Sequence, residues 1–122
     1  MKINSKILIV EDEIIIALDL KIHLEHLGHE ISSIAFNGKD AIKLTGETNP
    51  DLVLMDIQLN GEMDGIEVAQ QIHKLYNIPF IYLTGSYDNS LLERAKQTNP
   101  IVFITKPFDE TEIQNLIENS YH

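Results

Sequence analysis

Five short apolar runs alternate with five amphipathic segments along the chain, and this alternation constrains the fold more strongly than any other feature of the sequence. The runs cover residues 6–10, 31–36, 51–55, 80–83 and 101–104. Most of them are apolar at consecutive positions, which is typical of strands buried on both faces. The run at 31–36 is less apolar, as expected for an edge strand. Such strands, each followed by a helix, predict a parallel sheet with helices on both faces.

The segments between the runs carry helical signals. Between residues 17 and 27, apolar residues recur at the spacing of one helix face, and Gly28 follows where a helix C-terminus favours glycine. Similar stripes predict four more helices. Polar capping residues mark their expected starts at Asn37, Asp64, Asp88 or Asn89, and Asp109. We therefore expect an α/β fold with five helices and five parallel strands in the flavodoxin-like order 2-1-3-4-5.

Length and composition limit the class of protein. The chain is expected to form one domain, residues 1–122, and 43% of its residues are apolar. The absence of cysteine excludes disulfides and thiolate metal sites, and we expect a cytoplasmic location. No apolar stretch is long enough to span a membrane, and the N-terminus lacks a signal-peptide pattern. A net charge of −10 argues against direct binding to nucleic acids.

Charged or reactive side chains follow four of the five predicted strands. Glu11 and Asp12 come after the first strand, and Asp56 comes after the third. Thr84 follows the fourth strand and Lys106 the fifth. Open α/β sheets bind ligands at the carboxyl edge, where the strand order reverses. In the predicted order that point lies between the first and third strands, which carry the three acids.

This combination of residues is typical of phosphoryl chemistry around a cation. Carboxylates in one crevice repel one another unless they take up a proton or bind a cation. Mg²⁺ prefers oxygen ligands and needs only one or two carboxylates and a phosphate oxygen, and Asp12 and Asp56 can supply the carboxylates. An aspartate can also act as a nucleophile and form an acyl phosphate. Lys106 and Thr84 can hold the phosphoryl oxygens through an ammonium and a hydroxyl.

Each of these residues has a simpler interpretation when it is considered alone. Glu11 and Asp12 could cap the first helix. Asp56 could be a turn residue, and Thr84 could be an ordinary strand threonine. Lys106 could be a solvated loop lysine. Together, however, four separate elements deliver acids, a hydroxyl and an amine to one sheet edge, which favours the functional interpretation.

Over nearly its whole length the sequence resembles the receiver domains of two-component response regulators. The resemblance rests on motifs that occur in the order and at the spacing of that family: Val10-Glu11-Asp12-Glu13, Asp51-Leu52-Val53-Leu54-Met55-Asp56, Met63-Asp64-Gly65, Leu83-Thr84 and Lys106-Pro107-Phe108. It implies that Asp56 accepts a phosphoryl group from a histidine kinase or a phosphotransfer protein. Such a domain is a switch and not a conventional enzyme, although it catalyses its own phosphorylation and slow dephosphorylation.

The resemblance also implies a metal site. By analogy with that family, Asp12, Asp56 and the backbone carbonyl of Gln58 would bind Mg²⁺. Glu11 contacts a metal-bound water. These four residues are therefore the expected metal-site residues of this chain.

The remaining implied roles concern the switch. Thr84 and Lys106 would hold the phosphoryl oxygens, and Phe103 stands where the family places its switch aromatic. The peptide bond before Pro107 is commonly cis in such domains. The output would be control of transcription or of kinase activity through a domain beyond this sequence. The implied partners are the phosphodonor, a second receiver in a homodimer, and a linked effector or kinase domain; membrane binding is not expected.

Two departures from the family pattern stand out. The loop after Asp56 is one residue longer than the commonest pattern and has Asn60-Gly61 where a proline is usual. We expect this to alter the path of the loop but not the acceptor. Gly85 replaces the more usual alanine, which is expected to loosen the loop after Thr84.

Three other functions are compatible with parts of this pattern. A haloacid-dehalogenase-like phosphatase also has a nucleophilic aspartate after a strand, but it needs an acid two residues later, where this chain has Gln58. A flavodoxin-like FMN binder needs a phosphate-cradling loop after the first strand, where this chain has Glu11-Asp12-Glu13. The third alternative is a receiver-like scaffold that is never phosphorylated, and a phosphorylation assay decides it.

Overall fold

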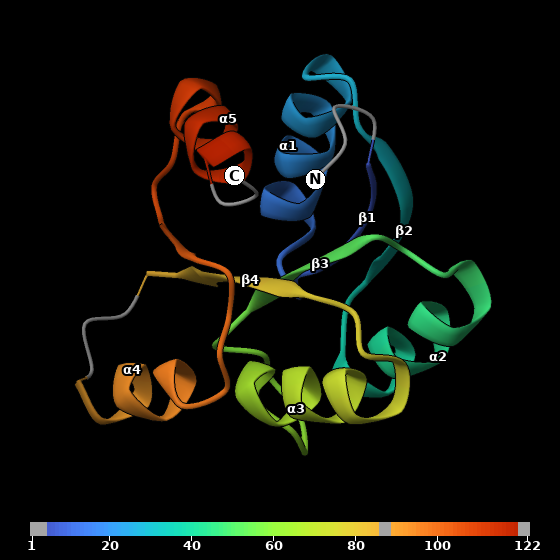
Figure 1. Ribbon diagram of the computed structural model, residues 1–122, viewed down its shortest axis with the longest axis vertical. Helices are drawn as coiled ribbons and strands as arrows, with labels where there is room; N and C mark the ends of the chain where they lie inside the picture. Colours follow the sequence, from blue (N-terminus) through green and yellow to red (C-terminus); the bar gives the residue numbers. More distant parts are fainter. Residues whose placement is uncertain (1–4, 86–88, 120–122) are drawn as a thin grey trace.

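The computed structural model describes residues 5–85 and 89–119 and confirms the predicted architecture (Figure 1). Strands and helices alternate along the chain: β1 (Lys6–Val10), α1 (Ile14–His26), β2 (Glu30–Ala35), α2 (Gly38–Thr48), β3 (Leu52–Asp56), α3 (Gly65–Tyr76), β4 (Phe80–Thr84), α4 (Asn89–Lys96), β5 (Phe103–Thr105) and α5 (Glu110–Asn119). All five strands are parallel and lie in the order β2-β1-β3-β4-β5. The strand order therefore reverses between β1 and β3, as predicted.

Helices cover both faces of the sheet, and they do so because successive strand residues point to opposite sides. α1 and α5 lie side by side on one face, whereas α2, α3 and α4 cover the other (Figure 1). In β1, for example, Ile7 and Ile9 pack toward α1 and α5, and Leu8 and Val10 pack toward the opposite layer. Each face thus has its own buried apolar cluster, and the functional side chains are left for the edge.

Capping residues set where several helices begin and end. Asp64 and Glu67 form the predicted capping box at α3, with an Asp64 Oδ1 to Glu67 N distance of 2.9 Å. Asn37 caps α2 by accepting a hydrogen bond of 2.8 Å from the Asp40 amide. α2 and α3 both end at asparagines in the left-handed conformation, Asn49 and Asn77, with φ of 49° and 55°.

Other boundaries differ from the sequence-based expectation or fall outside the described residues. β5 begins at Phe103, two residues later than predicted. Ile101 and Val102 nevertheless remain hydrogen-bonded to β4, through Ile101 N to Phe80 O at 2.9 Å and Tyr82 N to Val102 O at 3.2 Å. The alternative start of α4 at Asp88 lies outside the described residues. Within residues 5–85 and 89–119, no helix has the length and apolar character needed to cross a membrane.

Candidate functional site

The strands bring the predicted acids together at the carboxyl edge of the sheet. Glu11 and Asp12 directly follow β1, and Asp56 is the last residue of β3. β1 and β3 are neighbours, paired through Val10 and Met55. As a result, one carboxylate oxygen from each of the three acids lies within 4.8 Å of the others. The three acids therefore lie together at the carboxyl edge of the sheet.

The other two predicted side chains come from the neighbouring strands. Thr84 ends β4 and is 5% exposed, and Lys106 directly follows β5. The Lys106 amide donates a hydrogen bond of 2.8 Å to the Thr84 carbonyl, which continues the pairing of the two strands to the site. The Lys106 side chain reaches across the edge, and its Nζ lies 2.8 Å from Glu11 Oε1 and 3.6 Å from Asp56 Oδ1. Lys106 is therefore a site residue and not a solvated loop lysine.

The helix-capping interpretation of the first two acids is not what the structure shows. The residue at the N-cap of α1 is Glu13, and it makes no side-chain capping hydrogen bond. Glu11 is fully buried beneath the site, and the Glu11 amide pairs with the Ala35 carbonyl at 3.0 Å, continuing the β1–β2 pairing. Asp12 is partly buried and its Oδ2 accepts a hydrogen bond of 3.1 Å from the Asn60 amide.

Electrostatically, Glu11 is the most perturbed group in the site. Burial, together with the adjacent Asp56, raises the pKa of Glu11 to about 8, although Lys106 opposes that rise. Burial works against the charge of Lys106, but the Glu11 hydrogen bond and the nearby acids outweigh it and raise the pKa of Lys106. One ammonium does not offset three close carboxylates, so the raised pKa of Glu11 favours its protonated form when no cation is bound.

One carboxylate oxygen of Glu11 lacks a partner in the site. Glu11 Oε2 is buried and has no hydrogen-bond partner within the described part of the chain. When Glu11 is ionised, this buried and unpaired oxygen is costly, and a hydrated divalent cation would supply its missing partner. Three clustered carboxylates are hard oxygen ligands, so the donor set fits Mg²⁺.

The loop after β3 is tied to the acids through its backbone. Gln58 N donates to Asp56 Oδ1 at 3.1 Å, and Asn60 N donates to Asp12 Oδ2 at the same distance. Gly61 then adopts a φ of 122°, which side chains of L-residues rarely adopt. The chain bends at residues 61–63, and the backbone of the longer loop contacts the carboxylates of Asp12 and Asp56. At the start of α3, Gly65 packs against the end of β3, and an added Cβ there would overlap the Asp56 carbonyl oxygen.

The residues expected to form the switch lie beside the site. Phe103 is half-buried, and its ring is tilted against Tyr82 with the two centroids 5.6 Å apart. The Lys106–Pro107 peptide bond is cis, as predicted. The loop after Thr84, which Gly85 is expected to loosen, lies mostly outside the described residues.

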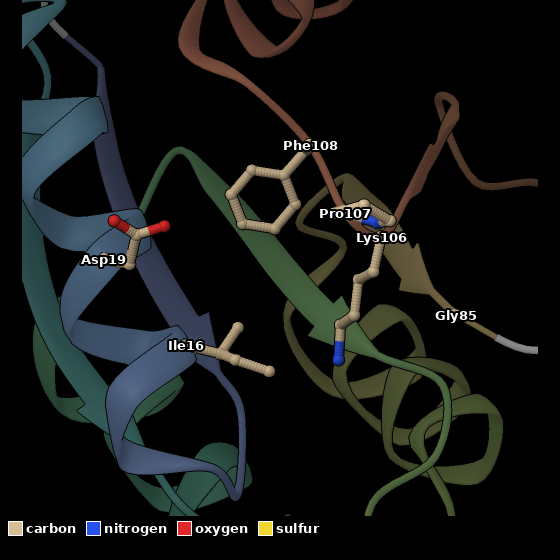
Figure 2. A pocket seen from close by; sticks show the side chains of 6 residues that line it. All are labelled: Ile16, Asp19, Gly85, Lys106, Pro107 and Phe108. Carbon is tan, nitrogen blue, oxygen red and sulfur yellow. The ribbon is translucent and has the colours of Figure 1, made fainter.

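A cavity of about 400 Å³ opens beside Lys106, between α1 and the segment that leads into α5. Its lining is Ile16, Asp19, Gly85, Lys106, Pro107 and Phe108 (Figure 2). Figure 2 shows Asp19 on the α1 side and Phe108 on the opposite side, with the Lys106 ammonium directed away from Phe108. The cavity therefore borders the functional site through the stem of Lys106.

Three polar contacts between side chains were not predicted from the sequence. His23 and His26 both contact Glu110, and the Tyr82 hydroxyl lies 2.6 Å from Thr98 Oγ1. The i, i+3 spacing of the histidines in the last turn of a helix is a signal that sequence reading could have used. Their partner is more than 80 residues away, and only the packing of α5 on α1 brings it there.

Comparison with known proteins gives a consistent result. A family model described as the response regulator receiver domain matches residues 7–118. The chain is 34% identical over 116 residues to the transcriptional regulatory protein PdtaR of Mycobacterium tuberculosis, covering 95% of this chain and 56% of PdtaR. It is 32% identical over 117 residues to the phyllosphere-induced regulator PhyR of Methylorubrum extorquens, covering 95% of this chain and 43% of PhyR. The chain thus spans about half the length of these relatives.

A solved structure extends the likeness to the fold. The signal receiver domain of a modulated diguanylate cyclase from Desulfovibrio desulfuricans superposes with a TM-score of 0.91 at 35% identity, over 98% of this chain and 94% of that one.

Proposed function

The chain belongs to the family of response regulator receiver domains, and on that premise we propose that Asp56 accepts a phosphoryl group from a histidine kinase or a phosphotransfer protein in a Mg²⁺-dependent reaction. The observation that carries the proposal is the convergence of Glu11, Asp12, Asp56 and Lys106 at one sheet edge. A carboxylate nucleophile, a cation site and a fixed ammonium are the parts that phosphoryl transfer requires.

The chain's own residues would hold the ion. Asp12, Asp56 and the Gln58 backbone carbonyl are the proposed ligands, and Glu11 would contact a bound water through its unpaired Oε2. Mg²⁺ in such a site offsets the charge of the phosphoryl oxygens and of the carboxylates.

Asp56 would act as the nucleophile. A bond forms between an Asp56 carboxylate oxygen and phosphorus while the phosphorus–nitrogen bond to the donor's imidazole breaks, and the bond electrons return to that imidazole. Lys106 is already 3.6 Å from Asp56 Oδ1, so a small movement away from Glu11 would place its ammonium against a phosphoryl oxygen. The Thr84 hydroxyl, at the end of the adjacent strand, would bind a second phosphoryl oxygen.

The phosphodonor needs a docking surface next to this pocket, and α1 offers one. Ile14, Ile15, Leu18 and Ile22 lie on one side of the helix and are between 48% and 84% exposed. Their row begins two residues after Asp12. Several large apolar side chains exposed together on a small domain indicate a protein-binding surface.

The output is proposed to run through protein contacts. The relatives that the chain matches include PdtaR, whose name describes a transcriptional regulator, and the PhyR of Bartonella quintana, whose solved structure is described as an anti-anti-sigma factor. Both are longer than this chain, so the effector, like any receiver homodimer, remains part of the proposal.

The proposal is tested with acetyl phosphate and Mg²⁺, followed by intact-mass measurement. We expect one added phosphoryl group that hydroxylamine removes, because hydroxylamine cleaves acyl phosphates. Asp56→Asn should abolish the addition and EDTA should suppress it, whereas Asp40→Asn, an exposed aspartate outside the site, should leave it unchanged. Persistence of the modification in Asp56→Asn would show that the acceptor lies elsewhere.

A further inference from the structure

His23 on α1 lies between two carboxylates that come from different helices. Its Nδ1 is 2.9 Å from Glu110 Oε1 on α5, and its Nε2 is 3.3 Å from Asp19 Oδ1 on α1. A neutral imidazole has one N–H, so it would direct an unprotonated nitrogen at one of these acceptors. The Nδ1 contact is a hydrogen bond and the Nε2 contact is an ion pair by distance, and only the imidazolium presents a positively charged N–H to both carboxylates. The geometry therefore favours a doubly protonated His23.

His26 differs from His23 although it contacts the same carboxylate. Its Nδ1 lies 2.8 Å from Glu110 Oε2, and its side chain is 74% exposed. A neutral ring with its hydrogen on Nδ1 satisfies this single contact. His26 thus serves as a matched control, because it makes the same bond to Glu110 without needing the second proton.

The helix ends add to the preference for charge at this junction. His23 and His26 lie in the last turn of α1, where the helix dipole favours a cation. Glu110 lies in the first turn of α5, where the dipole favours an anion. Among the described residues, Asp19 and Glu110 are the titratable groups in contact with His23. The Glu110 hydrogen bond, despite partial burial of the ring and with help from Asp19, raises the pKa of His23.

We propose that His23 is a proton-dependent clamp between α1 and α5, closed while both of its ring nitrogens carry hydrogen and loosened when one proton leaves. Loss of the proton leaves one of the two carboxylates facing a nitrogen lone pair. If the lone pair faces Glu110, the bond to α5 is lost; if the remaining hydrogen is on Nδ1, that bond persists but loses the positive charge that strengthened it. The clamp does not depend on phosphorylation of Asp56.

The position of the clamp links it to the functional site. Glu110 is four residues beyond Lys106 and two beyond Phe108, so the start of α5 helps to hold the segment that carries both. Asp19, the second partner of His23, lines the cavity beside Lys106 (Figure 2). Opening the clamp would therefore change the wall of that cavity and the support of Lys106 together.

The test is an NMR titration of the unmodified protein without Mg²⁺, so its outcome is independent of the proposed phosphorylation. The ring nitrogens of His23 should report the imidazolium at pH values where an ordinary histidine, with a pKa near 6.5, has lost its proton. Glu110→Gln should lower the midpoint of His23 most, and Asp19→Asn should lower it less. A neutral His23 ring at pH 6.5, or a midpoint unchanged in Glu110→Gln, would overturn the proposal.

A second readout separates a clamp from a histidine that is merely charged. The Ile113 amide donates to the Asp109 carbonyl at 3.1 Å and reports the first turn of α5. At pH 6 its hydrogen exchange should be severalfold faster in His23→Gln than in wild type, and the difference should shrink at pH 8.5. In His26→Gln the wild-type pH dependence should persist. Equal exchange in wild type and His23→Gln at pH 6 would show that His23 does not hold α5.

Discussion

The ammonium of Lys106 lies 2.8 Å from Glu11 Oε1, which joins two residues that are 95 positions apart and belong to opposite ends of the chain. This contact connects β5 to the centre of the sheet and leaves Lys106 only 3.6 Å from Asp56. The lysine thus partners the buried acid, and it is close enough to Asp56 to bind a phosphoryl oxygen there under the proposed function.

Removing the Lys106 ammonium should separate metal binding from switching. Lys106→Ala should bind Mg²⁺ as tightly as wild type or more tightly, because a cation near the ion is lost, but it should fail to phosphorylate or to switch. Without Mg²⁺ it should be destabilised by about 1–3 kcal/mol, because Glu11 loses its charged partner. Calorimetry, mass measurement and urea unfolding give the three readouts.

In Lys96→Ala, which breaks an exposed pair with Glu93, stability should change by less than about 1 kcal/mol. A Lys106→Ala protein that phosphorylates and switches normally would contradict the assigned role.

The raised pKa of Glu11 predicts a distinctive pH profile for the metal-free domain. The pKa rises from 4.5 to about 8 on folding, so the folded state holds an extra proton between these values. The stabilisation that this proton on Glu11 gives to the folded state is complete below pH 4.5 and is lost as the pH rises through 8. In EDTA, stability should therefore decline across this window in wild type and much less in Glu11→Gln, with exposed Glu13→Gln as the control. Mg²⁺ binding at pH 7 should release close to one proton, measured by calorimetry in buffers of different ionisation enthalpy. A flat profile in EDTA would show that Glu11 titrates normally.

Two glycines next to the site should respond oppositely to the same substitution. Gly65→Ala places a methyl group on the Asp56 carbonyl oxygen and should cost about 3 kcal/mol or more, or prevent folding. In Gly85→Ala the added Cβ would meet Lys106 Cβ at 3.6 Å, an ordinary contact. That change should stabilise the protein by about 0.4–1 kcal/mol through the unfolded state. Thermal unfolding with Mg²⁺ measures both; similar losses for the two variants would contradict the packing described.

The conformational effect of phosphorylation should extend through Thr84 and Phe103 to a face of the protein away from the pocket. The Thr84 hydroxyl is expected to move toward the phosphoryl oxygen and to vacate space into which the half-buried Phe103 ring can turn. Full burial of an apolar ring contributes about 1.5–3 kcal/mol, and Phe103 would gain only part of this, so the change should be a population shift of about one power of ten. With beryllofluoride and Mg²⁺, NMR shifts should extend to α4, β5 and α5 in wild type and stay near Asp56 in Thr84→Ala. Distant shifts that Thr84→Ala leaves unaltered would rule out this route.

Much of the fold was predictable because it depends on local, periodic signals. Consecutive apolar positions before Glu11, Asp56 and Thr84 indicate buried strands, and the Asp64–Glu67 spacing indicates a helix start, whatever the rest of the chain does. Once the strands are parallel, their carboxyl ends must share one edge, so the composition of the site follows from the order of the chain.

Such local signals do not predict contacts between side chains that are far apart in the sequence. That Lys106 pairs with Glu11 before any phosphoryl group arrives, that Glu11 is buried with one oxygen unpaired, and that Glu110 meets His23 all depend on how α1, α5 and the strand ends pack. The tilted contact between the half-buried Phe103 ring and Tyr82 likewise depends on the pairing of β4 with β5. The physical reason is that burial, charge partners and the resulting pKa of Glu11 or His23 are set by neighbours in space, whereas the sequence alone specifies which groups are present and at which end of each strand they emerge.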